Sequence, residues 1–458
     1  MAEKVLEVID LQTVFQTNEG ATTAVDKISF TLYRGETLGI VGESGSGKSV
    51  TSLSIMRLLA MPTATIASGQ ILFYPKGQAK PIDLLRLSEN EMRKYRGSEL
   101  AMIFQEPMSS LNPVFTCGYQ VVEAILLHQN VNKKSAEKQT LELFARVQLP
   151  DPHRVFNAYP HQLSGGQKQR VMIAMALSCK PSILIADEPT TALDVTVQKT
   201  ILELLRKLQH EEEESIIFIT HDLGVIAEVA DRVLVMYKGR IVEQGSVYDI
   251  FKKPQHPYTK GLLACRPPLD YRLKRLPIVS DFMTAIPTKD WFEIEEKPTT
   301  IKEITDDVIV THDEQNARLT DLYIQRPLIS VENISTWFPR SNNWIGVSND
   351  YIKAVDNISF EVYPGETLGL VGESGCGKTT LGRSLLRLIE PQQGSVYYQG
   401  KDLMKMTPDA LKKQRRQMQI IFQDPFSSLN PRSTIGNAII EPMQVHELYS
   451  SEAERIKR

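Results

Sequence analysis

The sequence predicts an α/β fold that occurs twice along the chain, the second time incompletely. Two observations support this prediction: long blocks recur in the same order, and short apolar runs alternate with helical segments. The blocks at 24–30 and 34–49 return 330 residues later, and the block IFQEPMSSLNP at 103–113 returns 318 residues later. Because this period far exceeds the 20–50 residues of stacked repeats, the pattern indicates a duplicated domain.

The first copy alternates between predicted strands and helices. Residues 5–11 and 28–33 alternate apolar with polar side chains, as half-buried strands do. Four further short runs are mostly apolar, which is typical of strands buried in a mostly parallel sheet: 38–42, 182–187, 215–220 and 232–237. A helical segment follows the first of these runs, and residues 88–180 are rich in helix. We therefore expect an α/β core with a helical insert.

Composition excludes several classes of protein. The 458 residues carry a net charge of −3, so no basic surface for nucleic acid is expected. The longest apolar run has seven residues, at 171–177, whereas a membrane-spanning helix needs about 20. The N-terminus lacks the apolar core of a signal peptide. The four cysteines form no CxxC pair, so neither a disulfide framework nor a zinc site is expected. These features indicate a reduced, cytosolic protein.

The two copies are separated by acidic sequence. Residues 289–314 contain nine Asp or Glu and three Lys, a local net charge of −6. We predict a solvated acidic linker over 270–325, between a first domain at 1–269 and a second at 326–458. The alternative is a small ordered subdomain anchored by Trp291, Phe292 and β-branched residues.

Residues 42–49, GESGSGKS, match GxxxxGK[ST] between a predicted strand and a predicted helix, the setting that a phosphate-binding loop requires. Glycines let backbone amides turn toward phosphates, and the helix presents its N-terminus to the anion. Lys48 is expected to reach the β- and γ-phosphates and Ser49 to bind Mg²⁺. The motif recurs at 372–379. The predicted nucleotide-binding residues of the two loops are Gly42, Glu43, Ser44, Gly45, Ser46, Gly47, Lys48 and Ser49, and Gly372, Glu373, Ser374, Gly375, Cys376, Gly377, Lys378 and Thr379.

Polar residues follow two later strands of the first copy. Asp187 ends one strand, where it can hold Mg²⁺ through water, and Glu188 can polarise the attacking water. His221 follows the next strand, where it can contact the γ-phosphate. LSGGQ at 163–167 precedes a helix, so Ser164 can serve as an N-cap and the helix start can bind an anion.

The P-loop, Gln105, LSGGQ, ILIADE, residues 191–194 and His221 occur in the order of the nucleotide-binding domains of ABC transporters, which the first copy resembles throughout. The resemblance implies a P-loop NTPase fold with a helical subdomain, and ATP and Mg²⁺ as its ligands. It implies catalytic roles for Glu188 and His221. The metal-binding residues that it implies are Ser49, Gln105, Asp187, Thr379 and Gln423. The further nucleotide contacts that it implies are Phe15 and its counterpart Phe338 against adenine, Gln105, Ser164, Gly165, Gly166, Gln167, Asp194 and Gln423.

A narrower resemblance rests on EPMSSLNP at 106–113 and QHPYT at 255–259, which are similar to the dipeptide/oligopeptide/nickel importer subfamily. Two fused domains resemble the ATP-binding subunits of glutathione and microcin C importers. The resemblance implies an ATPase that energises import of a peptide-like solute, bound peripherally to the cytoplasmic face of the inner membrane. Its implied partners are integral-membrane permease subunits and an extracytoplasmic solute-binding protein. Cys265 stands alone after HPYT, so no iron–sulfur site is inferred.

The second copy departs from the family pattern. It contains a P-loop and Gln423, but the offset of 318 residues puts the signature serine, the carboxylates and the histidine beyond residue 458. The family sandwiches ATP between two domains head to tail, so no site within one chain is complete and hydrolysis is expected to require self-association. Two alternatives are a soluble double ATPase acting on the ribosome, whose domains are joined by a long charged helix, and a nucleotide-binding fragment without turnover.

Overall fold

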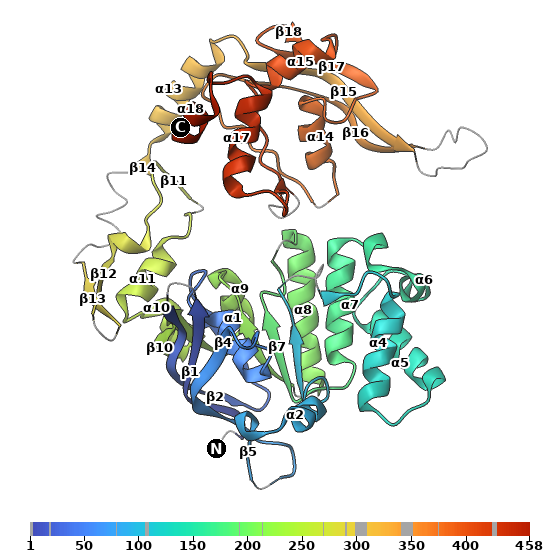
Figure 1. Cartoon of the computed structure of the whole chain (residues 1–458), viewed down its shortest axis with the longest axis vertical. Helices are drawn as coiled ribbons and strands as arrows, with labels where there is room; N and C mark the ends of the chain where they lie inside the picture. Colours follow the sequence, from blue (N-terminus) through green and yellow to red (C-terminus); the bar gives the residue numbers. More distant parts are fainter. Residues whose placement is uncertain are drawn as a thin grey trace. The chain divides into compact units, whose positions relative to one another are not determined.

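The computed structural model describes residues 3–17, 20–78, 80–105, 110–191, 193–212, 214–268, 270–288, 291–297, 309–339, 351–373, 375–423 and 428–458. The chain divides into two compact units, Met1–Val310 and Thr311–Arg458 (Figure 1). Each unit contains one copy of the repeat.

A four-stranded antiparallel sheet opens the first unit, in the order β2-β1-β4-β5. Its strands are β1 (Lys4–Thr17), β2 (Gly20–Tyr33), β4 (Ala64–Phe73) and β5 (Ile82–Asp83). Leu6, Val8 and Leu11 of β1 are fully buried. Leu6 and Val8 occupy even positions, whereas Leu11 occupies an odd one. A register shift separates them, and Asp10 in this shift adopts a positive φ of 45°. This bulge keeps the apolar side chains of both halves of β1 in the core.

A six-stranded sheet forms the centre of the first unit, in the order β10-β9-β3-β8-β7-β6. Its strands are β3 (Thr37–Val41), β6 (Leu100–Ile103), β7 (Ile183–Asp187), β8 (Ser215–Ile219), β9 (Arg232–Tyr237) and β10 (Arg240–Ser246). Only the pair β9–β10 is antiparallel. Every residue of β3, β7 and β8 is buried, as expected of parallel strands covered on both faces.

Side chains of the central sheet alternate between two cores. Ile40 and Ile185 pack in the core that contains the small antiparallel sheet. Val41, Leu184 and Phe218 belong to the core on the opposite face, which extends into the helices. The helices and 3-10 turns beside the two sheets are α1 (Lys48–Met56), η1 (Leu84–Arg86), α2 (Glu89–Tyr95), α8 (Val195–Glu212), α9 (Leu223–Val229), α10 (Val247–Lys252), α11 (Pro257–Ala264) and η3 (Val279–Asp281).

A helical subdomain lies at one end of the first unit, beside α8 (Figure 1). It contains α4 (Cys117–His128), α5 (Lys133–Arg146), α6 (Pro152–Asn157), η2 (Pro160–Gln162) and α7 (Gly165–Leu177). Val121, Phe144 and Val155 are buried among these helices and join the core of the adjacent sheet face. The predicted α/β core with a helical insert is therefore confirmed.

The sequence between the copies contains regular structure. Strands β12 (Met283–Pro287) and β13 (Phe292–Glu296) form a hairpin, and β11 (Arg272–Leu273) pairs with β14 (Ile309–Val310). Met283 is buried in the first unit's core, and Trp291 packs against that core. The hairpin is therefore partly ordered against the first unit through Met283 and Trp291, although many of its other residues are exposed. The domain boundaries at 269/270 and 325/326 remain predictions.

The second unit repeats the first antiparallel sheet, in the order β16-β15-β17-β18. Its strands are β15 (Ile329–Pro339), β16 (Tyr351–Val362), β17 (Gln393–Tyr398) and β18 (Lys401–Asp402). Its helices are α13 (His312–Tyr323), α14 (Lys378–Leu385), α15 (Pro408–Arg415), α17 (Ile435–Val445) and α18 (Glu452–Lys457). Val331, Leu381 and Val396 lie in its core. Strand order thus confirms the repeat seen in the sequence.

One repeated segment differs between the copies. Residues 367–371 have the same type of sequence as β3 but form no strand, and no described strand pairs with them. Leu368 is 47% exposed, whereas its counterpart Leu38 is 0% exposed. In the first copy, burial of this segment comes from β8 and β9, which lie much later in the chain. The buried state of this strand is thus conferred by distant sequence.

Alanine substitutions at these two leucines should have unequal effects on stability. Leu38→Ala leaves a cavity between the two sheets and should lower the free energy of unfolding of the first unit by about 2–5 kcal/mol. Leu368→Ala should change the stability of the second unit by less than about 0.5 kcal/mol. Pulse proteolysis across a urea series reports each unit separately, and equal destabilisation by both substitutions would contradict this account of burial.

Candidate nucleotide-binding site

The loop at residues 42–49 leaves the carboxyl end of β3 and enters α1 at Lys48. Gly42 and Gly47 adopt positive φ angles of 154° and 100°. A Cβ at Gly42 would lie 2.2 Å from the carbonyl oxygen of Met236, and one at Gly47 would lie 2.5 Å from that of Ala24. Only glycine allows this close approach to β9 and β2, and it leaves the first amides of α1 available to an anion.

Lys48 is buried at the centre of this loop. Its Nζ donates hydrogen bonds to the carbonyl oxygens of Gly42 at 2.8 Å and Glu43 at 2.9 Å. Burial lowers the pKa of Lys48, and the nearby carboxylates of Glu188 and Asp187 partly offset that effect. The hydroxyl of Ser46 is also buried and has no hydrogen-bond partner among the described residues. The loop therefore holds one cation and one unused polar group where a phosphate would bind.

Asp187 lies beside the start of α1. Its Oδ1 accepts a hydrogen bond of 3.0 Å from the hydroxyl of Ser49. Burial raises the pKa of Asp187 to about 6; the charge of Glu188 raises it too, while Ser49 and Lys48 counteract this. The hydroxyl and the carboxylate are hard oxygen donors, the type that Mg²⁺ prefers. These two donors would leave most positions of a six-coordinate ion for phosphate and water oxygens, as Mg²⁺ usually has.

The carboxylate of Glu188 forms hydrogen bonds with three side chains of the first copy. Its Oε2 accepts hydrogen bonds from Gln105 Nε2 at 3.0 Å and Thr191 Oγ1 at 2.9 Å. His221 Nδ1 lies 3.1 Å from Oε1 and donates when it carries the proton. The structure thus brings Gln105, Glu188 and His221 together, as their order in the sequence suggested. Sequence reasoning treated Thr191 only as part of a motif, although its spacing of three residues from Glu188 allows this contact.

The carboxyl group of Glu188 is held in its ionised form. Partial burial raises its pKa, but hydrogen bonds from His221 and Thr191 and the charge of Lys48 outweigh burial, so the net pKa lies below the ordinary value. Its backbone adopts a left-handed φ of 48°, which costs a non-glycine residue of order 1 kcal/mol. A fixed carboxylate of this kind can orient and polarise a water molecule.

The signature segment forms the N-terminus of α7. The hydroxyl of Ser164 accepts a hydrogen bond from the backbone N–H of Gln167 at 3.3 Å, and the side-chain oxygen of Gln167 accepts one from the backbone N–H of Ser164 at 3.2 Å. Asp194 accepts from the backbone of Val197 at the start of α8. No hydrogen bond between the described residues joins Ser164, Gln167 or Asp194 to the P-loop. These predicted nucleotide contacts therefore lie outside the cluster around Lys48.

The second copy reproduces the loop but not its surroundings. Lys378 Nζ donates to the carbonyl oxygens of Gly372 and Glu373, both at 2.6 Å, and Gly377 has a φ of 100°, as Gly47 does. Thr379 and Gln423 are exposed. Among the described residues, neither Lys378 nor Lys48 forms an ion pair with a carboxylate, but Lys48 lies close enough to Glu188 and Asp187 for their charges to act on it. This loop has the fold of a phosphate-binding loop without the acidic partners of Lys48.

Other predicted residues are placed as follows. Phe15 is half-buried on β1 opposite Thr22, and Phe338 is partly exposed on β15 opposite Ile352. Ser374, Ala192 and residues 106–109 of the EPMSSLNP segment lie outside the described residues.

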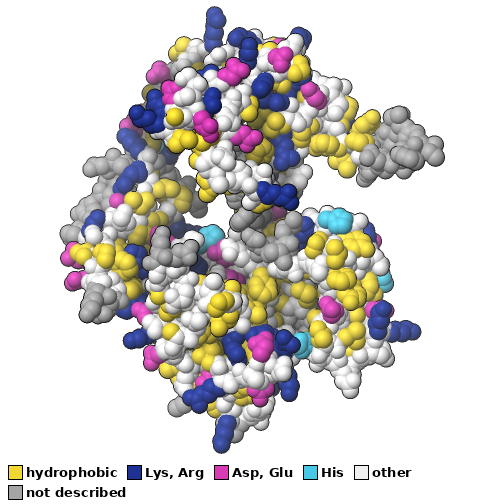
Figure 2. Space-filling view, in the orientation of Figure 1, with side chains coloured by type: hydrophobic (Ala, Val, Ile, Leu, Met, Phe, Trp, Pro, Cys, Tyr) yellow, Lys and Arg dark blue, Asp and Glu magenta, His cyan; other side chains and the backbone are white. Residues whose placement is uncertain are grey.

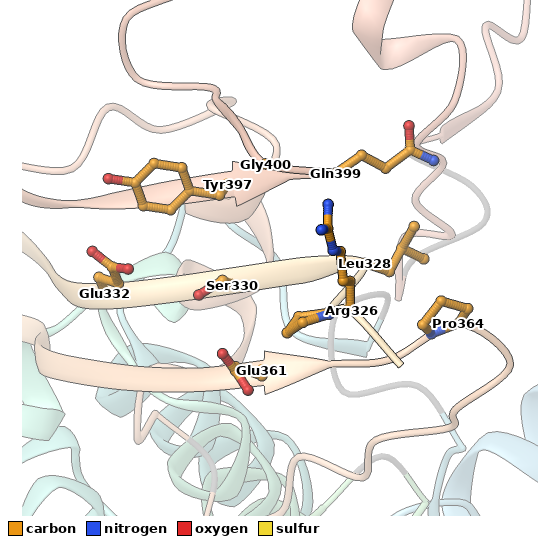
Figure 3. A pocket seen from close by; sticks show the side chains of 10 residues that line it. Arg326, Leu328, Ser330, Glu332, Glu361, Pro364, Tyr397, Gln399 and Gly400 are labelled. Atoms are coloured by element: carbon orange, nitrogen blue, oxygen red, sulfur yellow. The ribbon is translucent and has the colours of Figure 1, made fainter. Parts of the chain in front are cut away.

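A separate pocket of about 540 Å³ lies on the second unit (Figure 3). Ser330, Glu332, Glu361 and Tyr397 stand on its three neighbouring strands. Since these positions alternate with Val331 and Val396 of the core, the pocket occupies the outer face of the sheet. No residue of the loop at 372–379 lines it. It is therefore distinct from the candidate nucleotide site.

Comparisons with known proteins identify the family of the chain. Residues 25–191 and 355–457 match the family model described as ABC transporter. Residues 242–284 match the model described as oligopeptide/dipeptide transporter, C-terminal region. Together the two ABC segments cover more than half of the chain.

Two similar relatives carry the name glutathione import ATP-binding protein GsiA. The protein of Pectobacterium atrosepticum is 47% identical over 446 residues, which cover 97% of this chain and 68% of the relative. The protein of Escherichia coli (strain K12) is 47% identical over 456 residues, which cover 98% and 68%. A solved structure, the dimeric post-hydrolysis state of the ATP-binding cassette MJ0796 with ADP and Pi, aligns with a TM-score of 0.47 and 28% identity, covering 53% of this chain and 98% of that chain.

These sequence matches show the class of protein. The chain belongs to the ABC transporter family, as an ATP-binding protein of its oligopeptide/dipeptide importer subfamily. Within the described ranges, no helix is both long and apolar enough to cross a membrane.

Asp187 and Glu188 should affect stability in opposite directions. The raised pKa of folded Asp187 means that its ionisation removes stability as pH rises from the unfolded value near 3.8 to about 6. Asp187→Asn should therefore melt higher than the unmodified, nucleotide-free protein at pH 7.5, with a smaller advantage at pH 4.5. The pKa of folded Glu188 is lowered, so its ionisation adds stability as pH rises. Glu188→Gln should therefore have a lower melting temperature than the unmodified protein at pH 7.5. Thermal melts at the two pH values test both, and a lower melting temperature of Asp187→Asn at pH 7.5 would refute the electrostatic account.

Proposed function

We propose that the chain binds and hydrolyses ATP at its first copy to energise import of a peptide or peptide-like solute. The observation that carries this proposal is the convergence of Lys48, Asp187 and the hydrogen-bonded pair Glu188–His221 at the carboxyl ends of β3, β7 and β8. In open α/β sheets, ligands bind at this edge.

The first copy would act on ATP as follows. Lys48 exchanges the carbonyl oxygens of Gly42 and Glu43 for oxygens of the β- and γ-phosphates. Ser49 Oγ and, through water, Asp187 would hold Mg²⁺ near Gln105; this ion would neutralise charge on the phosphates. Glu188 orients and polarises the attacking water, and His221 contacts the γ-phosphate. Transfer goes directly to water, without a covalent enzyme intermediate.

A complete site requires a second nucleotide-binding domain. The N-terminus of α7, with Ser164 and Gln167, offers amides and a hydroxyl that can contact the γ-phosphate bound to another domain. The first copy contains both parts of such a site, the P-loop at 42–49 and the signature segment at 163–167. We therefore propose that two chains pair their first copies around a two-fold axis, which completes two sites at once.

Permease subunits would dock on the helical subdomain. Val114, Phe115, Tyr119 and Leu127 are exposed there, and the rings of Phe115 and Tyr119 stack with centroids 5.0 Å apart. Hydrophobic side chains gather over this end of the first unit in the space-filling view (Figure 2). An exposed apolar patch of this kind fits a protein interface. Docking would place the chain peripherally on the cytoplasmic face of the inner membrane, where the permease receives solute from an extracytoplasmic solute-binding protein.

Mixing two inactive variants tests the paired site. Glu188→Gln removes the carboxylate that orients water, and Ser164→Arg blocks the signature, so each variant alone should lose nearly all ATPase activity. A mixed dimer has one intact site, and random pairing at 1:1 should restore about one quarter of the normal activity. Phosphate release measures the recovery. Absence of any recovery, with normal ATP binding by both variants, would overturn the pairing of first copies.

The solute is tested by uptake. The match at 242–284 and the two relatives support a peptide or glutathione as cargo. Cells that lack the gene for this chain should lose uptake of radiolabelled glutathione, of a tripeptide, or of both, and Glu188→Gln should fail to restore it. Normal uptake of both, with loss of an unrelated solute such as nickel, would contradict the proposed cargo.

A further inference from the structure

Tyr258, the tyrosine of HPYT, lies directly beneath the P-loop. Its side chain is 0% exposed, and its hydroxyl oxygen accepts a hydrogen bond of 2.9 Å from the backbone N–H of Glu43. Glu43 is the second residue of the loop, 215 residues earlier in the chain. Burial raises the pKa of Tyr258 above its usual range, so the phenol stays neutral and keeps this contact at physiological pH.

The rest of the motif fixes the position of this tyrosine. His256 caps α11, because its Nδ1 accepts from the backbone of Tyr258 at 3.1 Å, and Pro257 occupies the first turn of the helix. The backbone N–H of His256 donates to the carboxylate of Glu243 on β10 at 3.1 Å. The ring of Tyr258 packs on Tyr237, at the end of β9, with centroids 4.5 Å apart. These contacts orient the hydroxyl of Tyr258 toward the P-loop.

A second connection reaches the other half of the loop. The indole N–H of Trp291 donates to the carbonyl oxygen of Lys238 at 3.2 Å, and the next residue, Gly239, donates its backbone N–H to the carbonyl oxygen of Ser46 at 3.0 Å. Arg240 lies over the Trp291 ring at 4.7 Å, and Lys238 lies over the Phe292 ring at 3.5 Å. The hairpin β12–β13 thus contacts the turn at Lys238 and Gly239, and this turn contacts the P-loop at Ser46.

We propose that the segment after the ATPase core, residues 255–297, is a positioning element for the P-loop and that Tyr258 is its positioning residue. The inference rests on the proposed function, since it concerns the geometry in which the loop amides receive phosphate. Tyr258 does not touch the nucleotide. Its hydroxyl accepts a hydrogen bond from Glu43 N–H and so holds the loop in the conformation that binds phosphate. Because the loop has this conformation before the nucleotide arrives, the conformational cost of nucleotide binding is lower.

Tyr258→Phe removes the hydroxyl and keeps the ring, so it tests this role directly. In a Lys378→Ala background, which confines binding to the first copy, it should weaken MgADP binding by about threefold to tenfold, the range expected from one net hydrogen bond. The KM for ATP should rise with little change in kcat. Tyr237→Phe is the matched control: it lies in the same cluster, its hydroxyl has no hydrogen bond among the described residues, and it should change affinity by less than about twofold.

Glu43→Pro provides an independent test, because proline removes the N–H donor. Tyr258→Phe should have no further effect on MgADP affinity in that background, which a general loss of packing would not produce. Equal affinity of Tyr258→Phe and the unmodified protein, or an additive loss in the Glu43→Pro background, would overturn the positioning role. Failure of the Lys378→Ala protein to bind MgADP at all would instead overturn the proposed function.

Discussion

Strand β3 is paired on both sides, through Leu38 with Ile217 of β8 and through Ile40 with Leu234 of β9. This double pairing fixes the point where the P-loop leaves the sheet. Because β7 pairs with β8 in parallel, the carboxyl ends of all three strands meet at one edge. Lys48 and Asp187 can interact only because this sheet brings residues separated by well over a hundred positions together. The acidic and basic groups of the site thus depend on backbone hydrogen bonds in the sheet.

The two units show what that sheet contributes. Both contain the small antiparallel sheet and a P-loop with glycine at the same left-handed position, so local sequence suffices for these features. Burial of the strand before the loop does not follow from local sequence, as the exposure of Leu368 shows. The charged environment of Lys48 does not follow either, since it comes from Asp187 and Glu188. In the first copy, the loop and the charged groups around Lys48 therefore come from different parts of the sequence.

Sequence patterns predicted the elements whose signals are local. The glycine spacing at 42–49 placed the loop, and the apolar run before Asp187 placed that carboxylate at a strand end. Patterns could not predict the hydrogen bond between Glu43 and Tyr258. Its donor is a backbone N–H, which nearly every residue has, and the partners are 215 residues apart. Local acidity predicted a solvated linker over 270–325, and it gave no sign that Trp291 within this range donates a hydrogen bond to the carbonyl oxygen of Lys238. Composition averages over a window, whereas the contact of the hairpin with the first unit depends on single side chains such as the partly buried Trp291.

The long separation between β3 and its partners also has a consequence for synthesis on the ribosome. Residues 37–41 emerge well before 215–219 and 232–237, the segments that will cover them. At about 5–20 residues per second, this strand waits roughly ten to forty seconds for β8. During that time the strand lacks the two partners that bury its apolar side chains in the folded unit. The nascent chain therefore presents a hydrophobic strand to chaperones, or to neighbouring copies on the same messenger RNA, before any nucleotide can bind.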